Sequence, residues 1–144
     1  KMIDVSEIQV ENGHLFLNTG SPHHISFYNS VTAINVKEIG AKIRYGAPYF
    51  EKGTNVNFAE KINDDTFVIR TYERGVEGET LSCGTGATAV AIAMFHSNQT
   101  TSKSISLETQ GGVLKVQFEP HHSSFTEVWL CGPAKQVFKA ELEW

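Results

Sequence analysis

The 144-residue chain carries a formal net charge of −4, with 40% hydrophobic and 19% charged residues. These proportions are those of a folded globular domain, and a domain of this size buries roughly 70% of the surface of its unfolded chain. Lysines and arginines form no cluster, which argues against a nucleic-acid-binding or anionic-membrane-binding surface. The longest apolar stretch, residues 87–95, is far shorter than the roughly 20 residues of a membrane helix.

The cysteine content and the start of the chain indicate a cellular compartment. Cys83 and Cys131 are the two cysteines, and two thiols are too few for a disulfide scaffold in a chain of this length. Residues 1–10 lack the apolar segment of a secretory signal. We therefore expect a reduced, cytoplasmic protein. Because the sequence opens on Lys1, we also expect it to be part of a longer protein.

The first half of the chain is predicted to hold strands and one helix. Asn12-Gly13 is a hairpin signal between two alternating segments, and residues 20–23 form a turn. Val36, Ile39 and Ile43 have helical spacing, which predicts a helix over residues 36–45 that Ala47-Pro48 ends. The predicted strands are residues 5–10, 14–17, 25–28, 54–59 and 66–71.

The second half is predicted to contain a central helix followed by strands. Residues 84–97 read as a helix that is small or apolar on nearly all sides, and such a helix is buried rather than lying on a surface. Strands are expected at residues 104–107, 113–118, 125–130 and 135–142. The fold class is therefore α+β, one domain over residues 1–144, with a mixed, mostly antiparallel sheet wrapped around the buried helix.

The polar, glycine-rich loop at residues 73–86 contains Cys83, which lies immediately before the first turn of this helix. The first amides of a helix have no internal partners, and with the helix dipole they stabilise negative charge. A thiol at such a position is stabilised as a thiolate. Gly84 and Gly86 would let an anion approach the backbone. We expect a carboxylate to bind the amides of Gly84, Thr85 and Gly86, with the Cys83 sulfur beside its adjacent carbon.

Three other interpretations of this loop compete with a carboxylate site. Residues 84–89 fit a dinucleotide-binding pattern with Glu108 as its acidic residue. That pattern needs its first glycine at the end of a strand, whereas here about a dozen residues intervene and the following strands look hairpin-like rather than βαβ. The absence of a Gly-Lys-Ser/Thr sequence excludes a P-loop. An inert buried Cys83 stays open, although the flanking Glu, Arg and Gly residues favour function.

Four segments carry a resemblance to one enzyme family over nearly the whole chain. Residues 73–87 read ERGVEGETLSCGTGA, which resembles the second catalytic motif of the diaminopimelate epimerases, E-R-G-x-G-E-T-x-A-C-G-[ST]-G-A. In the same order as in that family, residues 20–23, 53–58 and 130–134 are similar to its G-N-P-H turn, its R-x-N-x-x-F strand and its closing x-T-G-P-A.

The resemblance implies an activity and a set of site residues. Members of the family interconvert LL- and meso-diaminopimelate in lysine and peptidoglycan biosynthesis, using two cysteines on opposite faces of the α-carbon and neither pyridoxal phosphate nor a metal. By resemblance, the catalytic residues are Cys83, His23 and Glu73. The implied substrate-binding residues are Ser21, Asn55, Glu73, Arg74, Gly84 and Thr85.

The sequence departs from the family pattern at several places. Ser21 replaces an asparagine, Ser82 replaces an alanine, and Glu77 is one residue extra between Arg74 and Gly78. Nothing resembles the first-half motif C-G-N-G-x-R. We therefore expect a C-terminal half that folds alone but does not epimerise alone, whose last strand, about residues 137–144, belongs with the absent N-terminal half. Its exposed cleft face would also allow self-association, including a homodimer.

Two other functions remain as alternatives: another racemase or isomerase of the same superfamily, and a domain that binds carboxylates without catalysis. The remaining candidates have ordinary interpretations. His24 is predicted to point to the opposite face of a strand from His23, which makes the pair a poor metal site. His121-His122 is expected in a solvated loop, and Cys131 is expected to be a buried strand residue.

Overall fold

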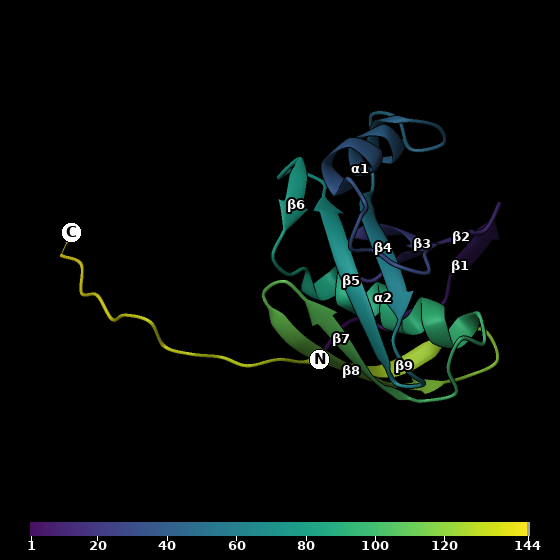
Figure 1. Cartoon of the computed structure of the whole chain (residues 1–144). Helices are drawn as coiled ribbons and strands as arrows, with labels where there is room; N and C mark the ends of the chain where they lie inside the picture. Colours follow the sequence, from purple (N-terminus) through teal and green to yellow (C-terminus); the bar gives the residue numbers. More distant parts are fainter. Residues whose placement is uncertain (144) are drawn as a thin grey trace.

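The computed structural model describes residues 1–143 as nine strands and two helices (Figure 1). The strands are β1 (Ile8–Glu11), β2 (His14–Asn18), β3 (Pro22–Phe27), β4 (Asn55–Lys61), β5 (Thr66–Glu73), β6 (Gly78–Thr80), β7 (Ser104–Thr109), β8 (Gly112–Pro120) and β9 (Phe125–Cys131). The helices are α1 (Val36–Tyr45) and α2 (Gly84–His96). The expected α+β class is confirmed, and the short strand β6 lies inside what the sequence predicts to be loop.

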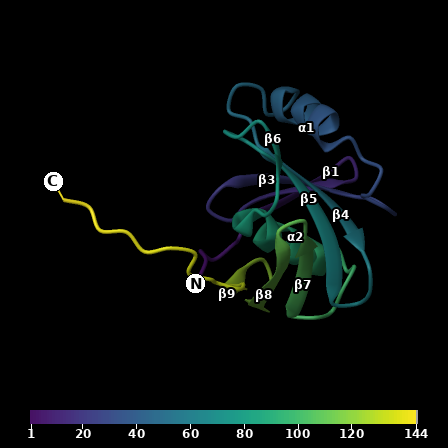
Figure 2. The ribbon, with the colours of Figure 1, turned by 60° about the vertical axis from the view of Figure 1, so that its left-hand side comes forward.

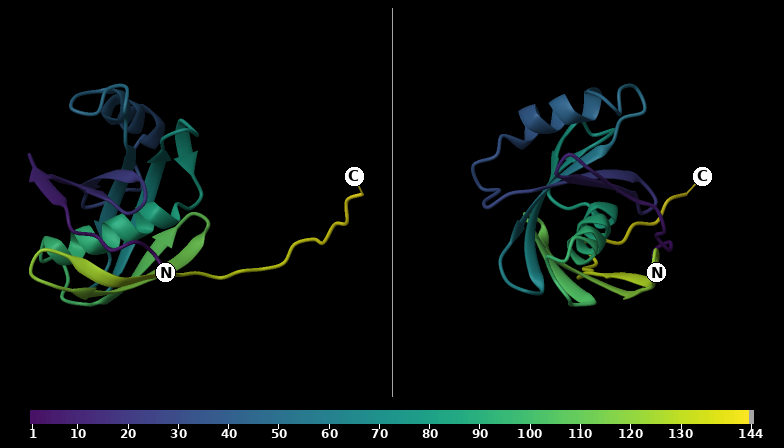
Figure 3. Two further views of the ribbon diagram at one scale, coloured as in Figure 1. Left: turned by 180° about the vertical axis from the view of Figure 1, so that it is seen from behind. Right: turned by 90° about the vertical axis from the view of Figure 1, so that its right-hand side faces the viewer.

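The strands form one mixed sheet in the order β1-β2-β3-β4-β5-β7-β8-β9, with β6 paired to β5. Two neighbouring pairs, β3 with β4 and β5 with β7, are parallel, and the others are antiparallel. The sheet curls around α2, whereas α1 lies outside the curve (Figures 2 and 3). The predicted sheet wrapped around a central helix is therefore confirmed.

The two parallel pairs explain why the helices lie on opposite faces. Helix α1 connects β3 to β4, and the connection from β5 to β7 runs through β6 and α2. The connections β3 to β4 and β5 to β7 are crossovers of the same hand, and both step in the same direction across the sheet. Because β5 runs antiparallel to β4, the two crossovers place their helices on opposite faces of the sheet. The expectation of purely hairpin-like strands after α2 is wrong in this respect: β7 and β8 form a hairpin, but β7 also pairs parallel with β5.

The alternation of side chains along the strands separates two apolar clusters. On β4, Val56 and Phe58 join the cluster that packs against α1, whereas Ala59 joins the cluster around α2. On β5, Tyr72 lies on the α1 face, whereas Phe67 lies on the α2 face. This period-two pattern is what a sheet covered on both faces requires.

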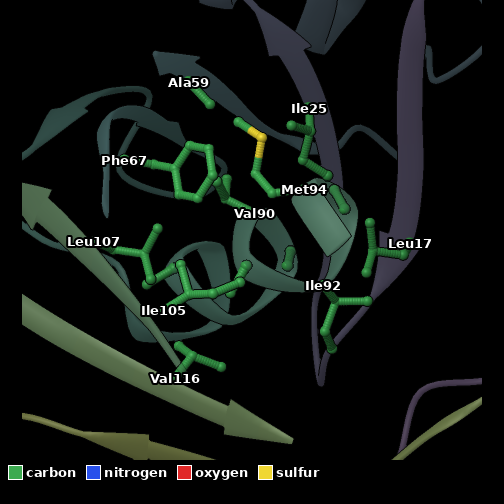
Figure 4. Close-up of a cluster of buried hydrophobic side chains, with 14 of the residues drawn as sticks. Leu17, Ile25, Ala59, Phe67, Val90, Ile92, Met94, Ile105, Leu107 and Val116 are labelled. Carbon is green, nitrogen blue, oxygen red and sulfur yellow. The ribbon is translucent and has the colours of Figure 1, made fainter. Parts of the chain in front are cut away.

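Helix α2 is buried along most of its length, as the sequence predicts. Its residues from Gly86 to Met94 are all buried. Figure 4 shows side chains from several strands, among them Ile25, Phe67 and Leu107, packed around the helix. Small side chains such as Ala89 and Ala91 let the strands approach the helix from different directions.

The predicted last strand does not form. Residues 132–143 contain no secondary structure and extend away from the domain (Figure 1), and residue 144 lies outside the described residues. A strand needs a hydrogen-bonding neighbour, and at the start of β9 that place is taken by the N-terminal segment, since Val5 and Phe125 exchange backbone bonds of 2.9 and 2.7 Å. Cys131, at the end of β9, is exposed, so the expectation of a buried cysteine is wrong. Within residues 1–143, no helix is long and apolar enough to cross a membrane.

Replacing Ile92→Ala tests the buried helix. Ile92 is 0% exposed, so the shorter side chain should leave a cavity and lower the free energy of unfolding by about 2–5 kcal/mol, measured by urea denaturation. The matched control is Ile62→Ala, at a position 51% exposed, where a change within about 0.5 kcal/mol is expected. Equal losses at the two positions would contradict this account of the core.

Candidate functional site

The inner face of the sheet changes from apolar to polar at the N-terminal end of α2. Beside the body of the helix, the strands present residues such as Ile25 and Phe67. Beside its first turn they present His23, Asn57 and Thr71, which are 0%, 0% and 3% exposed. Buried polar groups are costly unless they are hydrogen-bonded, so this end of the fold must be held by a specific bonding pattern.

Cys83 lies at the junction of this polar cluster with the helix. It is the N-cap residue of α2, with an extended backbone, and its side chain makes no capping hydrogen bond. Its residue is 9% exposed. Within residues 1–143, the amides of Gly84, Thr85 and Gly86 donate to no protein acceptor, and the first turn carries no acidic residue. Three donors and the positive end of the helix dipole are therefore available to an anion beside the sulfur.

A continuous set of hydrogen bonds joins the cysteine to the sheet. The Cys83 Sγ lies 3.5 Å from the Thr85 Oγ1, which lies 3.0 Å from the His23 Nε2. The His23 Nδ1 lies 3.0 Å from the Asn57 Nδ2, and the Thr71 hydroxyl donates to the Asn57 Oδ1 over 3.0 Å. The structure thus brings together the three sequence-predicted residues Cys83, His23 and Thr85.

A second bonding group fixes the turns that border the site. The Asn55 Nδ2 donates to the Ser21 Oγ at 2.7 Å and to the Pro22 carbonyl at 2.9 Å, while the Asn55 Oδ1 accepts from the Arg74 amide at 2.9 Å. The Thr19 hydroxyl donates to the Thr85 carbonyl at 2.8 Å. Asn55 is 3% exposed, and both of its amide hydrogens are already used inside the protein. In this arrangement it holds Ser21 and Arg74 next to each other.

Glu73 and Arg74 flank the site from the end of β5. Glu73 lies two residues after Thr71 on β5, so its side chain points to the same, inner face of the sheet. Among the described residues, its carboxylate makes no hydrogen bond or ion pair. The Arg74 Nη1 donates to the Lys52 carbonyl at 2.7 Å, and the residue is exposed. Glu73 is therefore free to receive a ligand, whereas Arg74 is anchored at one nitrogen.

The extra residue Glu77 has a defined structural role. It adopts a positive φ of 57°, and its carboxylate accepts from Arg44 at 3.2 Å and from the Tyr72 hydroxyl at 3.0 Å. It also accepts from the Gly75 amide at 3.1 Å. These bonds tie the enlarged loop to helix α1 and strand β5, on the side of the sheet away from α2. The contacts of the extra residue therefore lie on the opposite side of the sheet from Cys83.

Close packing explains both glycines that follow Cys83. A Cβ on Gly84 would lie 2.7 Å from the Leu130 Cδ2, and one on Gly86 would lie 2.6 Å from the Asn57 Oδ1. The same Gly86 Cβ would approach the Cys83 Sγ to 3.3 Å. Neighbouring side chains therefore leave little room for a Cβ at either position, and the expected approach of an anion to these two residues stays a prediction.

The two neighbouring histidines face opposite sides of the sheet, as expected. His23 points toward α2, whereas the His24 Nδ1 lies 2.8 Å from the Tyr49 hydroxyl on the other face. Burial, and to a smaller extent the Arg74 guanidinium, lower the pKa of His23 to about 3. Burial, followed by the nearby His14, lowers the pKa of His24 to about 4. Both rings are therefore neutral at neutral pH, which suits His23 to hydrogen bonding rather than to charge.

Asn57 and Thr71 are members of the site that the sequence interpretation misses. Each is an ordinary strand residue in the sequence, and only the pairing of Asn57 with Thr71 across β4 and β5 places them behind His23. The alternation of strand residues offers the one signal, because both positions are polar where an inner face should be apolar. No group of three His, Cys, Asp or Glu residues in the described chain could hold a metal ion.

Comparisons with known proteins agree on one family. The family model described as diaminopimelate epimerase matches residues 15–137. The diaminopimelate epimerase of Flavobacterium psychrophilum is 49% identical over 142 residues, which are 99% of this chain and 56% of that protein. The enzyme of Aquifex aeolicus is 42% identical over 129 residues, covering 89% of this chain and 45% of that protein. The chain thus spans about half the length of the curated relatives it matches.

Solved structures show the same fold at low sequence identity. A hydroxyproline epimerase from Agrobacterium vitis, with bound trans-4-hydroxy-L-proline, has a TM-score of 0.56 and 13% identity, covering 90% of this chain and 41% of that one. A phenazine biosynthesis protein of the PhzF family from Bacillus anthracis also has a TM-score of 0.56, with 19% identity, 90% of this chain and 40% of that one. These likenesses establish the architecture alone.

Replacing Gly86→Ala tests the close packing at the helix start. Alanine normally favours a helix, but here its Cβ would collide with Asn57, which is 0% exposed and held by hydrogen bonds, and would crowd Cys83. We expect a net loss of about 1–3 kcal/mol in the free energy of unfolding, measured with urea. The matched control is Gly78→Ala, whose Cβ would meet nothing within 4 Å and which should change stability by less than about 0.5 kcal/mol. A stabilised Gly86→Ala protein would show that this packing is looser than described.

The two buried histidines predict a loss of stability on mild acidification. Their pKa values of about 3 and 4 lie below the ordinary 6.5, so the unfolded chain binds protons that the folded chain does not. Their contribution is complete above pH 6.5 and is lost as the pH falls toward 4, by about 1.4 kcal/mol per pH unit for each histidine.

Urea denaturation between pH 6.5 and 5.5, about one pH unit above the ordinary glutamate pKa of 4.5, measures this slope. The His24→Gln variant should lose about half of the slope, whereas the exposed control His122→Asn should keep all of it. A stability that does not change over this range would mean that the rings become protonated within the fold.

Proposed function

The chain belongs to the diaminopimelate epimerase family, and from this we propose that it is the C-terminal half of an enzyme that interconverts LL- and meso-diaminopimelate without a cofactor. In this proposal Cys83 is one of two acid–base cysteines, and the substrate carboxylate binds the start of α2. The relatives are about twice as long, which supports a second half outside these residues.

The observation that carries the proposal is the juxtaposition of one sulfur with three unpaired amides. Cys83 precedes the amides of Gly84, Thr85 and Gly86, which have no acceptor in the described chain. A carboxylate held by these amides has its α-carbon one bond away, within reach of the neighbouring sulfur. No acidic side chain in the first turn competes for the site.

This geometry suits proton removal next to a carboxylate. As the Cys83 thiolate takes the α-proton, the electron pair of the broken C–H bond spreads onto the carboxylate oxygens. The helix amides and dipole then stabilise the negative charge that develops on the carboxylate oxygens in the transition state, and fixed dipoles lower the barrier most when they act on such developing charge. A thiol on the opposite face delivers a proton to the same carbon, and this inverts the centre.

The remaining site residues are assigned supporting roles. In this proposal the unpaired Glu73 carboxylate and the exposed Arg74 bind the polar groups of the substrate. Ser21 and Asn55 hold each other and the Arg74 backbone, so they shape the wall of the site. His23 is enclosed and reaches the site through Thr85.

We further propose that the second cysteine and the rest of the pocket come from the other half of the full-length protein. The described chain offers one other thiol, Cys131, which is exposed at the end of β9. The extended segment after β9 displays Val137 and Phe138, which are 81% and 78% exposed. Apolar residues on a segment without partners suit it to pairing with that half.

The test is solvent deuterium exchange at the α-carbon of diaminopimelate, followed by NMR or mass spectrometry. The full-length protein that contains these residues should catalyse exchange, and Cys83→Ser should lower its rate by about 10²–10⁴-fold because a positioned base is lost. The matched control is Cys131→Ser, which should retain the rate of the unaltered protein.

Three outcomes would contradict parts of this assignment. Binding of diaminopimelate without any exchange would leave a carboxylate-binding domain. Exchange that survives Cys83→Ser would remove the cysteine from the reaction. Full exchange by the 144-residue chain alone would show that no second half is needed.

A further inference from the structure

The hydrogen bonds behind Cys83 have a direction that can be read from the identity of the atoms. The chain of contacts runs from Thr71 through Asn57, His23 and Thr85 to Cys83. Its first three members, Thr71, Asn57 and His23, are at most 3% exposed, so solvent does not compete for the bonds among them, whereas Thr85 is half-buried. Each member must then donate where its neighbour accepts.

The orientation of the Asn57 amide is set by a group that can only accept. The Asn57 Nδ2 lies 3.1 Å from the backbone carbonyl oxygen of His24. The reversed amide would place its own oxygen against that carbonyl, and two acceptors would then face each other without a proton between them. The Thr71 hydroxyl donates to the Asn57 Oδ1, so both polar atoms of the Asn57 amide are hydrogen-bonded.

The amide orientation determines which nitrogen of His23 carries the proton. The Asn57 Nδ2 donates to the His23 Nδ1 at 3.0 Å, so that nitrogen must be unprotonated. A neutral ring then holds its proton on Nε2, which donates to the Thr85 Oγ1 at 3.0 Å. Because burial lowers the pKa of His23 to about 3, the ring is neutral at working pH.

The last hydrogen bond of this series is donated toward the Cys83 sulfur. The Thr85 oxygen accepts from His23, which leaves the threonine proton to be donated, and the Cys83 Sγ lies 3.5 Å away. A hydrogen bond donated to sulfur favours the thiolate over the thiol.

We propose that Asn57 is a positioning residue: it holds His23 with its proton on Nε2, so that Thr85 donates its hydroxyl proton to Cys83 and stabilises the thiolate. This rests on the proposed function of Cys83 as a base, and it adds Asn57 and Thr71 to that site. The charged neighbour of the ring is Arg74, which also disfavours a protonated His23. In this proposal, the groups that stabilise the Cys83 thiolate are therefore uncharged: the helix amides and the Thr85 hydroxyl.

The tautomer of His23 is measured directly on the 144-residue chain labelled with ¹⁵N. Long-range ¹H–¹⁵N correlation spectra distinguish a protonated Nε2 from a protonated Nδ1. The expected result is a neutral His23 with its proton on Nε2. In Asn57→Asp, a carboxylate replaces the donor, so the proton should move to Nδ1. A proton on Nδ1 in the unaltered chain would overturn the proposal.

The effect on the sulfur is measured as the pH profile of iodoacetamide alkylation of Cys83, in a Cys131→Ser background. Thr85→Val removes the hydroxyl and should move the midpoint of the profile upward by about one pH unit, which corresponds to one weak hydrogen bond to a charged atom. Asn57→Asp should shift it in the same direction, because the Thr85 hydroxyl would then donate to the His23 Nε2 instead.

Two further variants separate this role from a general loss of structure. Thr85→Ser retains a hydroxyl and should restore the profile of the unaltered chain. Thr88→Val makes the same replacement in the same helix, where the hydroxyl donates only to the Gly84 carbonyl, and should leave the profile unchanged. Equal profiles for Thr85→Val and Thr85→Ser would exclude the hydrogen bond to sulfur, even if Asn57→Asp does not fold.

Failure of this inference is distinguishable from failure of the proposed function. Neither the spectra nor the alkylation profile requires turnover of diaminopimelate. Deuterium exchange with the wrong His23 tautomer would remove the role of Asn57 and keep the enzyme, whereas the expected tautomer without exchange would keep the hydrogen-bond chain and remove the epimerase.

Discussion

The burial of helix α2 on all sides is the constraint on which the rest of the structure depends. A helix with nine consecutive buried residues, Gly86 to Met94, cannot lie on one face of a flat sheet, so the strands must curl around it. The curl fixes the position of the helix ends. At the N-terminal end, the amides that have no partner within the helix lie on the same side of the sheet as the polar residues of β3, β4 and β5. The chemistry of the site is therefore a consequence of how the core is built.

The alternation of strand residues lets one sheet serve two helices and one site. On β4, Val56 and Phe58 pack toward α1, while Asn55, Asn57 and Ala59 belong to the side of α2. The same inner row is apolar beside the body of the helix and polar beside its first turn. A change of register by one residue would send Asn57 to the α1 side, so the pairing of β4 with β3 and β5 protects the site as well as the core.

The electrostatic character of the site follows from this enclosure. His23 is surrounded by protein, and the cost of burying charge keeps its ring neutral. In the proposed mechanism, the stabilisation of negative charge at Cys83 is therefore left to backbone amides, the helix dipole and the hydroxyl of Thr85. Charged groups such as Glu73 and Arg74 remain at the rim, where solvent and a substrate can reach them. The extra residue Glu77 makes its contacts with Arg44 and Tyr72, on the side of the sheet away from α2.

The sequence by itself determined the features that depend on local patterns. The apolar helix after Cys83, the hairpin at Asn12-Gly13 and the α1 spacing are signals within a few residues, and the structure contains all three. The resemblance of the segment before and at the start of α2, and of the turn at residues 20–23, to one family also identified Cys83, Thr85 and His23, and hydrogen bonds connect these three. Tertiary structure alone decided that β5 and β7 are parallel, that residues 132–143 form no strand, and that Asn57 backs His23 across 34 residues of sequence. The physical reason is that strand partners and the orientation of a buried amide depend on register between distant segments, which no local periodicity records.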